Sequence, residues 1–262
     1  MTVQEALAST RLEPREARLL LAHATGFSEA AVLAFPERSL PREMEQKFMD
    51  FAERRRCGEP VAYILGRQEF YSLPLLVNPA VLIPRPETEL LVERALERQF
   101  SSAVDLGTGS GAIALALKKH RPAARVVAVE ASAAALHVAR RNAVALGFEV
   151  EWRHGQWFAP LNAERFELIV SNPPYVAAGD PHLAALRYEP VSALVSGVDG
   201  LDAMREIAAQ ARDHLMDDGW LLVEHGMGQD AAVRRLLEQG GLEEARTWPD
   251  LAGIPRVSGA KR

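Results

Sequence analysis

Residues 104–117 read VDLGTGSGAIALAL, and this stretch decides which fold class the sequence predicts. An apolar run ends at Asp105 and is followed by glycines at positions 107, 109 and 111. The remainder consists mainly of Ala, Ile and Leu, which favour a helix. A strand, a glycine turn and a helix in this order begin a βαβ unit. The free backbone N–H groups of such a turn lie at the start of the helix, where a ligand can approach them closely.

Strands and helices alternate in the same way along the chain after Phe100. Apolar runs predict strands at residues 103–107, 125–130, 149–155, 166–172 and 219–226, with two weaker strands after Gly241. Segments between them predict helices at residues 111–120, 132–147, 200–215 and 229–241. This alternation predicts an α/β fold built on a doubly wound, mostly parallel sheet of seven strands.

The first part of the chain has a different pattern. Residues 13–26 and 41–58 carry apolar side chains at helical spacing and end on glycines, so they predict helices. Residues 68–77 are rich in aromatic and apolar residues and predict a short hairpin. The sequence therefore predicts three parts: a helical N-terminal domain (residues 1–62), a hairpin with linker (63–84) and the α/β domain (85–262).

The bulk composition excludes several classes of protein. A formal net charge of -5 supplies no global basic field, so we expect no direct binding to nucleic acid. The single cysteine, Cys57, excludes an internal disulfide and a cysteine metal cluster, and we predict no metal site. Residues 1–20 are charged throughout and lack the apolar core of a signal peptide. No apolar run approaches the roughly 18 residues that a membrane span requires. These features predict a cytoplasmic protein without a membrane segment.

An acidic residue follows the glycine turn at the end of the next predicted strand. Glu130 lies nineteen residues beyond Gly111, at the end of the next predicted strand, where a carboxylate can accept both hydroxyls of a ribose. The glycine spacing is G-x-G-x-G, whereas the dinucleotide fingerprint is G-x-G-x-x-G. With Asp105 ahead of it, the pattern D-x-G-x-G-x-G resembles the first motif of class I S-adenosylmethionine (AdoMet) methyltransferases. In that class a carboxylate near the loop can help to hold the ammonium group of AdoMet.

A second motif ends another strand of the predicted sheet. Residues 169–176 read IVSNPPYV, and the two prolines stop the strand because they lack the N–H that a sheet ladder requires. Asn172 offers one acceptor and two donors, and a carbonyl in the stiff Pro173–Pro174 segment can accept a second hydrogen bond. Tyr175 offers a flat face for stacking. Together these residues suit a planar group that carries an NH₂.

Such a grip has a chemical use. An amide or aryl amine is a poor nucleophile because its lone pair is delocalised into the π-system. Two acceptors that hold its two N–H bonds can draw the nitrogen toward pyramidal geometry and aim the lone pair at a methyl group. Positioning of this kind is worth roughly 7–11 kcal/mol for well-oriented reactants. We therefore predict amino-group methylation without a histidine base.

Several long motifs in order narrow the choice further. Residues 59–93, 104–117, 169–176, 189–207 and 250–257 together resemble the HemK-type release factor glutamine methyltransferases. The resemblance implies a helical N-terminal domain that helps to recognise the substrate and a class I methyltransferase domain. It also implies a reaction, in which AdoMet methylates the N5 atom of the glutamine in the Gly-Gly-Gln motif of bacterial class I peptide-chain release factors. S-adenosylhomocysteine is the second product.

The resemblance also implies roles for single residues. The AdoMet site would be lined by Gly107, Thr108, Gly109, Ser110 and Gly111, with Glu130 at the ribose, Trp157 near the adenine and Asn172 also at the cofactor. The substrate glutamine would be held by Asn172, Pro173, Pro174 and Tyr175. Gln156 departs from the acidic residue that relatives often carry before the tryptophan position, which puts the strength of an adenine contact in doubt. Arg85 and Glu87 are second-rank candidates at the active site. Residues 189–194, EPVSAL, have two readings: a loop packed on the body of the domain, or a segment in which Glu189 ties down the long loop at residues 176–200.

Other functions remain open at the level of sequence. A sister family methylates a glutamine of a ribosomal protein, and other enzymes with the same tetrapeptide methylate amino groups of nucleic acid bases. A binding module that kept the fold without the activity is an alternative of a different class. The segment at residues 84–89, PRPETE, favours the release factor as the substrate.

Overall fold

Five helices make up the first part of the computed structural model, which describes residues 1–262 throughout. They are α1 (Val3–Ser9), α2 (Pro14–Thr25), α3 (Glu29–Ala34), α4 (Arg42–Arg56) and α5 (Val61–Leu65). Leu20, Leu21 and Phe48 are fully buried where α2 and α4 pack together. Helix α2 ends at Gly26, whose φ of 74° is the left-handed conformation that glycine adopts without steric cost. The predicted helical N-terminal domain is therefore confirmed.

The chain divides into two units, Met1–Arg67 and Gln68–Arg262. Strands β1 (Arg67–Phe70) and β2 (Leu73–Leu76) form the predicted hairpin at the boundary between them. The short 3-10 helix η1 (Pro86–Thr88) then leads into α6 (Glu89–Leu96). No helix of the molecule has the length and apolar character that a bilayer crossing demands.

The second unit contains a seven-stranded sheet in the order β5-β4-β3-β6-β7-β9-β8. Its strands are β3 (Ser102–Leu106), β4 (Arg125–Glu130), β5 (Glu151–His154), β6 (Phe166–Ser171), β7 (Leu215–Glu224), β8 (Glu243–Pro249) and β9 (Pro255–Lys261). All neighbouring pairs are parallel except those of β9 with β7 and β8. The predicted doubly wound, mostly parallel sheet is confirmed. Strand β7 begins four residues earlier than predicted, because Leu215 already pairs with Phe166, ahead of a register irregularity between Phe166 and Leu168.

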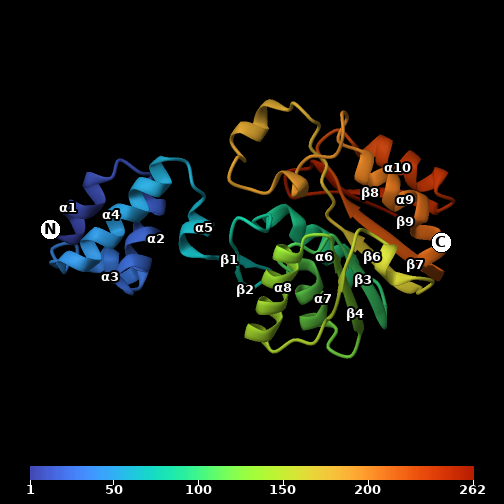
Figure 1. Ribbon diagram of the computed structural model, residues 1–262, viewed down its shortest axis with the longest axis horizontal. Helices are drawn as coiled ribbons and strands as arrows, with labels where there is room; N and C mark the ends of the chain where they lie inside the picture. Colours follow the sequence, from blue (N-terminus) through green and yellow to red (C-terminus); the bar gives the residue numbers. More distant parts are fainter. The chain divides into compact units, whose positions relative to one another are not determined.

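Helices cover both faces of this sheet (Figure 1), and a hydrophobic core lies on each face. One face carries α6, α7 (Ala112–His120) and α8 (Ala133–Leu146), and the other carries α9 (Asp202–His214) and α10 (Asp230–Gln239). The central strand shows how the sequence divides between the cores, since Ala103 joins the first and its neighbour Val104 the second. Successive side chains of a strand point to opposite faces of the sheet. A sheet that is covered on both faces therefore requires apolar residues at both sets of positions.

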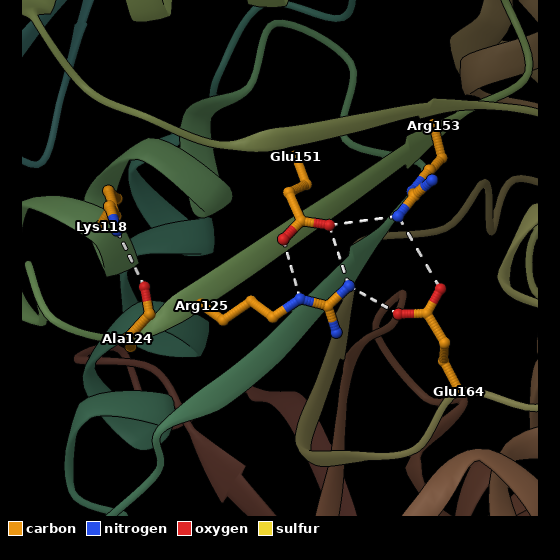
Figure 2. Close-up of polar contacts among 6 residues, drawn as sticks. All are labelled: Lys118, Ala124, Arg125, Glu151, Arg153 and Glu164. Carbon is orange, nitrogen blue, oxygen red and sulfur yellow. Dashed lines mark hydrogen bonds and ion pairs between the residues drawn. The ribbon is translucent and has the colours of Figure 1, made fainter.

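An ion-pair network ties the outer strands to the loop that follows β5 (Figure 2). Arg125 at the start of β4 binds Glu151 of β5 through two bonds of 2.8 and 2.9 Å and Glu164 through one of 2.5 Å. Arg153 adds a bond of 3.1 Å to Glu151. The Arg125 guanidinium holds the pKa of the Glu151 carboxyl below its ordinary value. The network ties Glu164, which follows the segment 155–163, to the starts of β4 and β5.

The strand order reverses between β3 and β6. The chain runs outward from β3 to β4 and β5, and then returns to place β6 on the other side of β3. Loops at the carboxyl ends of β3 and β6 therefore separate to opposite faces, which opens a crevice at the usual ligand position of such sheets.

Candidate functional site

A cavity of about 330 Å³ occupies that crevice, which is within the range of small-molecule sites. The predicted residues that line it come from four separate loops and are Gly107, Thr108, Gly109, Ser110, Glu130, Trp157, Asn172 and Pro174. Further parts of the wall are formed by Ala80, Val81, Leu82, Pro84, Arg85, Pro190, Ser192 and Ala193. The structure thus brings both sequence motifs to one cavity.

The glycine turn is shaped by left-handed backbone. Gly107, Gly109 and Gly111 have φ values of 72°, 57° and 86°, which side chains other than glycine rarely adopt. An added Cβ at Gly107 would lie 3.2 Å from the Trp157 ring, and one at Gly111 would lie 3.1 Å from Leu115. A Cβ at Gly109 would meet no atom within 4 Å. Of the three glycines, only Gly109 has room for a Cβ without a contact to another protein atom.

Asp105 lies beneath this turn and does not line the cavity. Its Oδ2 accepts from the Thr108 hydroxyl at 2.6 Å and from the backbone N–H of Ala114 at 3.2 Å. Burial raises the pKa of this carboxyl to about 7. The expectation that a carboxylate at this position holds a ligand ammonium is not met by the geometry, because Asp105 is fully buried and braces the loop from behind.

Glu130 reaches the cavity from the end of β4. Its Oε2 accepts from the Gly109 N–H at 2.9 Å and its Oε1 from the Ser132 N–H at 2.8 Å. A carboxylate has about four lone-pair positions, so each oxygen keeps one for a further donor. Glu130 therefore shapes the glycine turn and can still accept two hydroxyl groups of a ligand.

Gln156 and Trp157 form the wall beside Glu130. The Gln156 Nε2 donates to Glu206 at 3.2 Å, which leaves the side-chain carbonyl as the group available to a ligand. Trp157 has a φ of 44°, a left-handed conformation that is costly for a large side chain. Its indole N–H is buried and has no hydrogen-bond partner. An unsatisfied buried donor at a cavity is a feature that a ligand can explain.

The segment from Asn172 to Tyr175 begins at the end of β6, beside the glycine turn after β3. Asn172 and Pro174 line the cavity, whereas Pro173 is buried and Tyr175 turns away from it. The Tyr175 hydroxyl donates to Glu224 at 3.3 Å, and its backbone carbonyl accepts from Gln229 at 3.0 Å. The phenol is therefore held by the protein, contrary to the expectation of a free stacking face.

The long loop at residues 176–200 folds back on its own start. The N–H of Val176 donates to the Leu194 carbonyl at 2.8 Å, and the N–H of Ser196 returns a bond of 2.9 Å to Val176. Glu189 is buried, accepts from the Ile83 N–H at 3.0 Å and forms an ion pair with Arg85. This geometry supports the reading of Glu189 as a structural tie, which closes one wall of the cavity.

Some predicted residues stand outside the cavity wall, and some important ones were missed. Gly111 packs against α7 and α8, and Glu87 is exposed to solvent. Thr88 and Glu224 were not predicted, although Thr88 lies in the PRPETE segment and Glu224 ends a buried strand at the same edge. A charged residue that closes an apolar strand was the signal that could have identified Glu224.

Comparison with protein families agrees with both units. The model described as "Methyltransferase small domain" matches residues 86–188, and the model described as "PrmC N-terminal domain" matches residues 2–66. Among solved structures, a methyltransferase from Pyrococcus furiosus superposes with a TM-score of 0.57 at 17% identity, over 81% of this chain and 98% of that one. A T. thermophilus 16S rRNA methyltransferase solved with AdoMet and guanosine reaches 0.58 at 22% identity, over 75% and 49%. These two likenesses establish the methyltransferase fold.

Relatives of known name share far more of the sequence. The release factor glutamine methyltransferase of Pseudomonas aeruginosa is 51% identical over 93% of this chain and 90% of its own length. The proteins of the same name from Xylella fastidiosa and Neisseria gonorrhoeae are 49% and 46% identical, over 97% and 98% of this chain and over 94% and 97% of their own lengths. Identity of this extent covers both units and the crevice between β3 and β6. The chain therefore belongs to the family of release factor glutamine methyltransferases.

Proposed function

We propose that this protein transfers a methyl group from AdoMet to the side-chain nitrogen of the glutamine in the Gly-Gly-Gln motif of bacterial class I release factors. The products are N5-methylglutamine, S-adenosylhomocysteine and a proton. One observation carries the proposal: Asn172 and Pro174 share a single cavity with Glu130 and the glycine turn at residues 107–110. A group that holds an amide and a group that holds a nucleoside are thus within reach of one another.

The residues present fit AdoMet. Glu130 keeps an acceptor position on each oxygen for the two ribose hydroxyls, and Gly109 borders open space that a side chain would fill. The unpartnered indole N–H of Trp157 and the carbonyl of Gln156 supply a donor and an acceptor on the adjacent wall. When bound, AdoMet supplies a methyl group on a sulfonium, which is a strongly activated leaving group.

The substrate amide is held by the chain itself. Asn172 directs its Nδ2 to Thr88 at 3.1 Å, so its carbonyl oxygen is the group left for an incoming N–H. Pro174 lines the same cavity, and its fixed φ keeps this backbone in place. The Asn172 carbonyl and a carbonyl of the Pro173–Pro174 segment would accept from the two N–H bonds of the substrate amide and aim its nitrogen at the methyl group. Orientation of this kind accelerates the reaction.

The first unit suits a role in recognising the protein substrate. Its helices carry a charged exterior around a small apolar core, and Arg55 is fixed by Glu16 at 2.8 Å. We assign to this unit the contacts with the release factor that lie away from the glutamine. Such remote contacts offset the cost of ordering a flexible loop in the active site.

Methylation with labelled AdoMet tests the proposal. Initial rates are compared on an intact release factor, the same factor with its motif glutamine changed to alanine, a short peptide with the motif, and DNA. We expect label on the single glutamine of the intact factor, located by peptide mass mapping, and a much lower rate on the peptide. Label that persists in the alanine variant of the factor would refute this assignment. Label that appears in DNA would support base methylation in its place.

A further inference from the structure

Buried polar side chains behind the Asn-Pro-Pro-Tyr segment converge on one carboxyl group. The Asn172 Nδ2 donates to the Thr88 hydroxyl at 3.1 Å. Burial raises the pKa of the Glu224 carboxyl, and the adjacent Thr88 hydroxyl opposes this rise. The Tyr175 hydroxyl donates to Glu224 Oε1 at 3.3 Å from the other end of the segment. Glu224 is 1% exposed, and Thr88 is 4% exposed, so water does not substitute for these partners.

The direction of the hydrogen bonds along this chain of side chains matters for Asn172. A hydroxyl has one hydrogen, so a Thr88 hydroxyl that donates to Glu224 can only accept from Asn172. That arrangement requires the NH₂ of Asn172 to face Thr88 and leaves its carbonyl facing the cavity. Without an acceptor at Glu224, the Thr88 hydroxyl is free to donate to the Asn172 carbonyl. The amide would then turn over and present donors to a substrate that also brings donors.

We propose that Glu224 is a positioning residue, which acts through Thr88 and Tyr175 to hold both ends of the Asn-Pro-Pro-Tyr segment in the orientation that accepts the substrate amide. This inference rests on the proposed function and extends it to a residue outside the cavity wall. Glu224 Oε1 accepts from the Tyr175 hydroxyl, and Oε2 is buried without a partner. The residue needs to supply one acceptor oxygen at this point, and it touches neither substrate nor cofactor.

The geometry predicts which replacement of Glu224 is tolerated. Glutamine keeps an acceptor carbonyl at the Oε1 position and places its NH₂ where Oε2 has no partner. Methionine has a similar length and lacks an oxygen acceptor, so it fills the space and breaks the chain. We expect Glu224→Met to lower kcat about 10- to 100-fold, the range for losing a hydrogen bond to a charged group. Glu224→Gln should retain most of the turnover.

Binding constants separate positioning from general damage. Glu224 does not line the cavity, so the Kd for AdoMet should stay within about twofold of the wild type in both variants, as titration calorimetry measures. The KM for the release factor should also change little, since the loss lies in the orientation of the amide. A fall in kcat without a change in Kd and without a fall in melting temperature is a pattern that a purely structural role would not produce.

A double-mutant cycle tests whether Glu224 acts through Thr88. Thr88→Val removes the hydroxyl at nearly constant volume, and Thr88→Ser keeps it, so the serine variant should be the faster of the two. If both residues belong to one chain, Thr88→Val combined with Glu224→Met should lose little more than the single variants. Losses that multiply in the double variant would show independent effects and overturn the inference.

The NMR signals of the side-chain amides report on Asn172 without any measurement of turnover. The chain has four asparagines, so ¹⁵N labelling of asparagine gives four pairs of side-chain signals, and Asn172→Ala identifies the pair of Asn172. Glu224→Met should shift that pair, while Glu224→Gln should leave it close to the wild type. Asn142, which bonds to Leu76 and Ser110, serves as the internal control.

The outcomes distinguish this inference from the proposed function. A folded Glu224→Met variant with wild-type kcat and an unshifted Asn172 pair would overturn the positioning role while the methylation stands. A wild-type protein that does not methylate the release factor would overturn the proposed function, and the amide spectra would still decide whether Glu224 orients Asn172.

Discussion

Glu130 and Asn172 lie on the same cavity, but their bonds separate their roles. Glu130 is held by the N–H groups of Gly109 and Ser132 on the cofactor side, and Asn172 is held by Thr88 on the far side. A carboxylate that accepts two ribose hydroxyls contributes roughly 1.5–3 kcal/mol per bond. An amide that orients the acceptor nitrogen contributes to the rate and little to cofactor affinity.

Replacing each residue by alanine should therefore give opposite results. Glu130→Ala should weaken AdoMet binding about tenfold or more, because it removes the ribose acceptors and also releases the glycine turn. Asn172→Ala should bind AdoMet almost normally and lose methyl transfer by orders of magnitude. Titration calorimetry and single-turnover rates measure the two quantities. Unchanged affinity in a folded Glu130→Ala, or near-normal turnover in Asn172→Ala, would contradict these roles.

Single residues were predictable where the chemistry lies at the end of a strand. Glu130 and Asn172 both follow apolar runs, and parallel strands bring such positions to one edge. Thr88 and Glu224 escaped prediction because their importance lies in a contact between segments 136 positions apart. Nothing local in the sequence shows which buried hydroxyl meets which carboxyl. The burial of Asp105 depends on how its own loop folds over it, onto Thr108 and Ala114.

At the scale of elements, the glycine turn between β3 and α7 gives a matched pair of variants. Alanine at Gly109 or at Gly111 carries a similar backbone cost of about 1–2 kcal/mol, since both positions are left-handed. At Gly111 the added Cβ also meets Leu115, Ala139 and Trp152 at 3.1 to 3.3 Å, and overpacking costs about 1–3 kcal/mol more. At Gly109 it meets no protein atom.

We therefore expect Gly111→Ala to have the lower free energy of unfolding. Gly109→Ala should be the more stable of the two and yet lose more affinity for AdoMet. Urea unfolding without ligand and titration calorimetry with AdoMet make the comparison. Equal stability of the two variants would mean that the contacts behind Gly111 relax freely. Normal AdoMet binding by Gly109→Ala would mean that the open space beside this glycine is not used by the cofactor.

Most elements were predictable because their ends carry local signals. Gly26 and Gly147 end helices in left-handed conformation, and Ser132 caps the start of α8 by accepting from Ala135. The loop at residues 176–200 was predicted only as a long connection. Its pairing with its own start, and its tie from Glu189 to Arg85, depend on tertiary contacts that have no period in the sequence.

At the scale of the whole molecule, proton binding couples folding to the functional edge of the sheet. Asp105 ends one strand segment there and Glu224 ends another, and both carboxyls are fully buried. Burial raises the pKa of each to about 7, from ordinary values of 3.8 and 4.5. A raised carboxyl pKa means that the folded chain holds protons that the unfolded chain has released. This contribution to stability is complete below pH 4 and is lost as the pH rises toward 7 and above.

Replacing Glu224 by glutamine isolates this effect. At pH 5 the carboxyl is neutral in the folded protein, and glutamine resembles it, so the two proteins should have similar stability. At pH 8 the wild type buries a carboxylate and the variant does not. The variant should then be the more stable protein by up to about 3 kcal/mol, at 1.36 kcal/mol per pKa unit.

The carboxyl groups with lowered pKa, such as Glu151, act below pH 4.5, and His225, whose pKa burial lowers, is present in both proteins. Because these other groups are the same in both proteins, their contributions cancel when the free energy of unfolding of the wild type in urea is subtracted from that of the variant at each pH from 5 to 8. A difference that stays flat over this range would show that Glu224 titrates normally in the folded protein. It would also mean that the buried end of the hydrogen-bond chain is open to water.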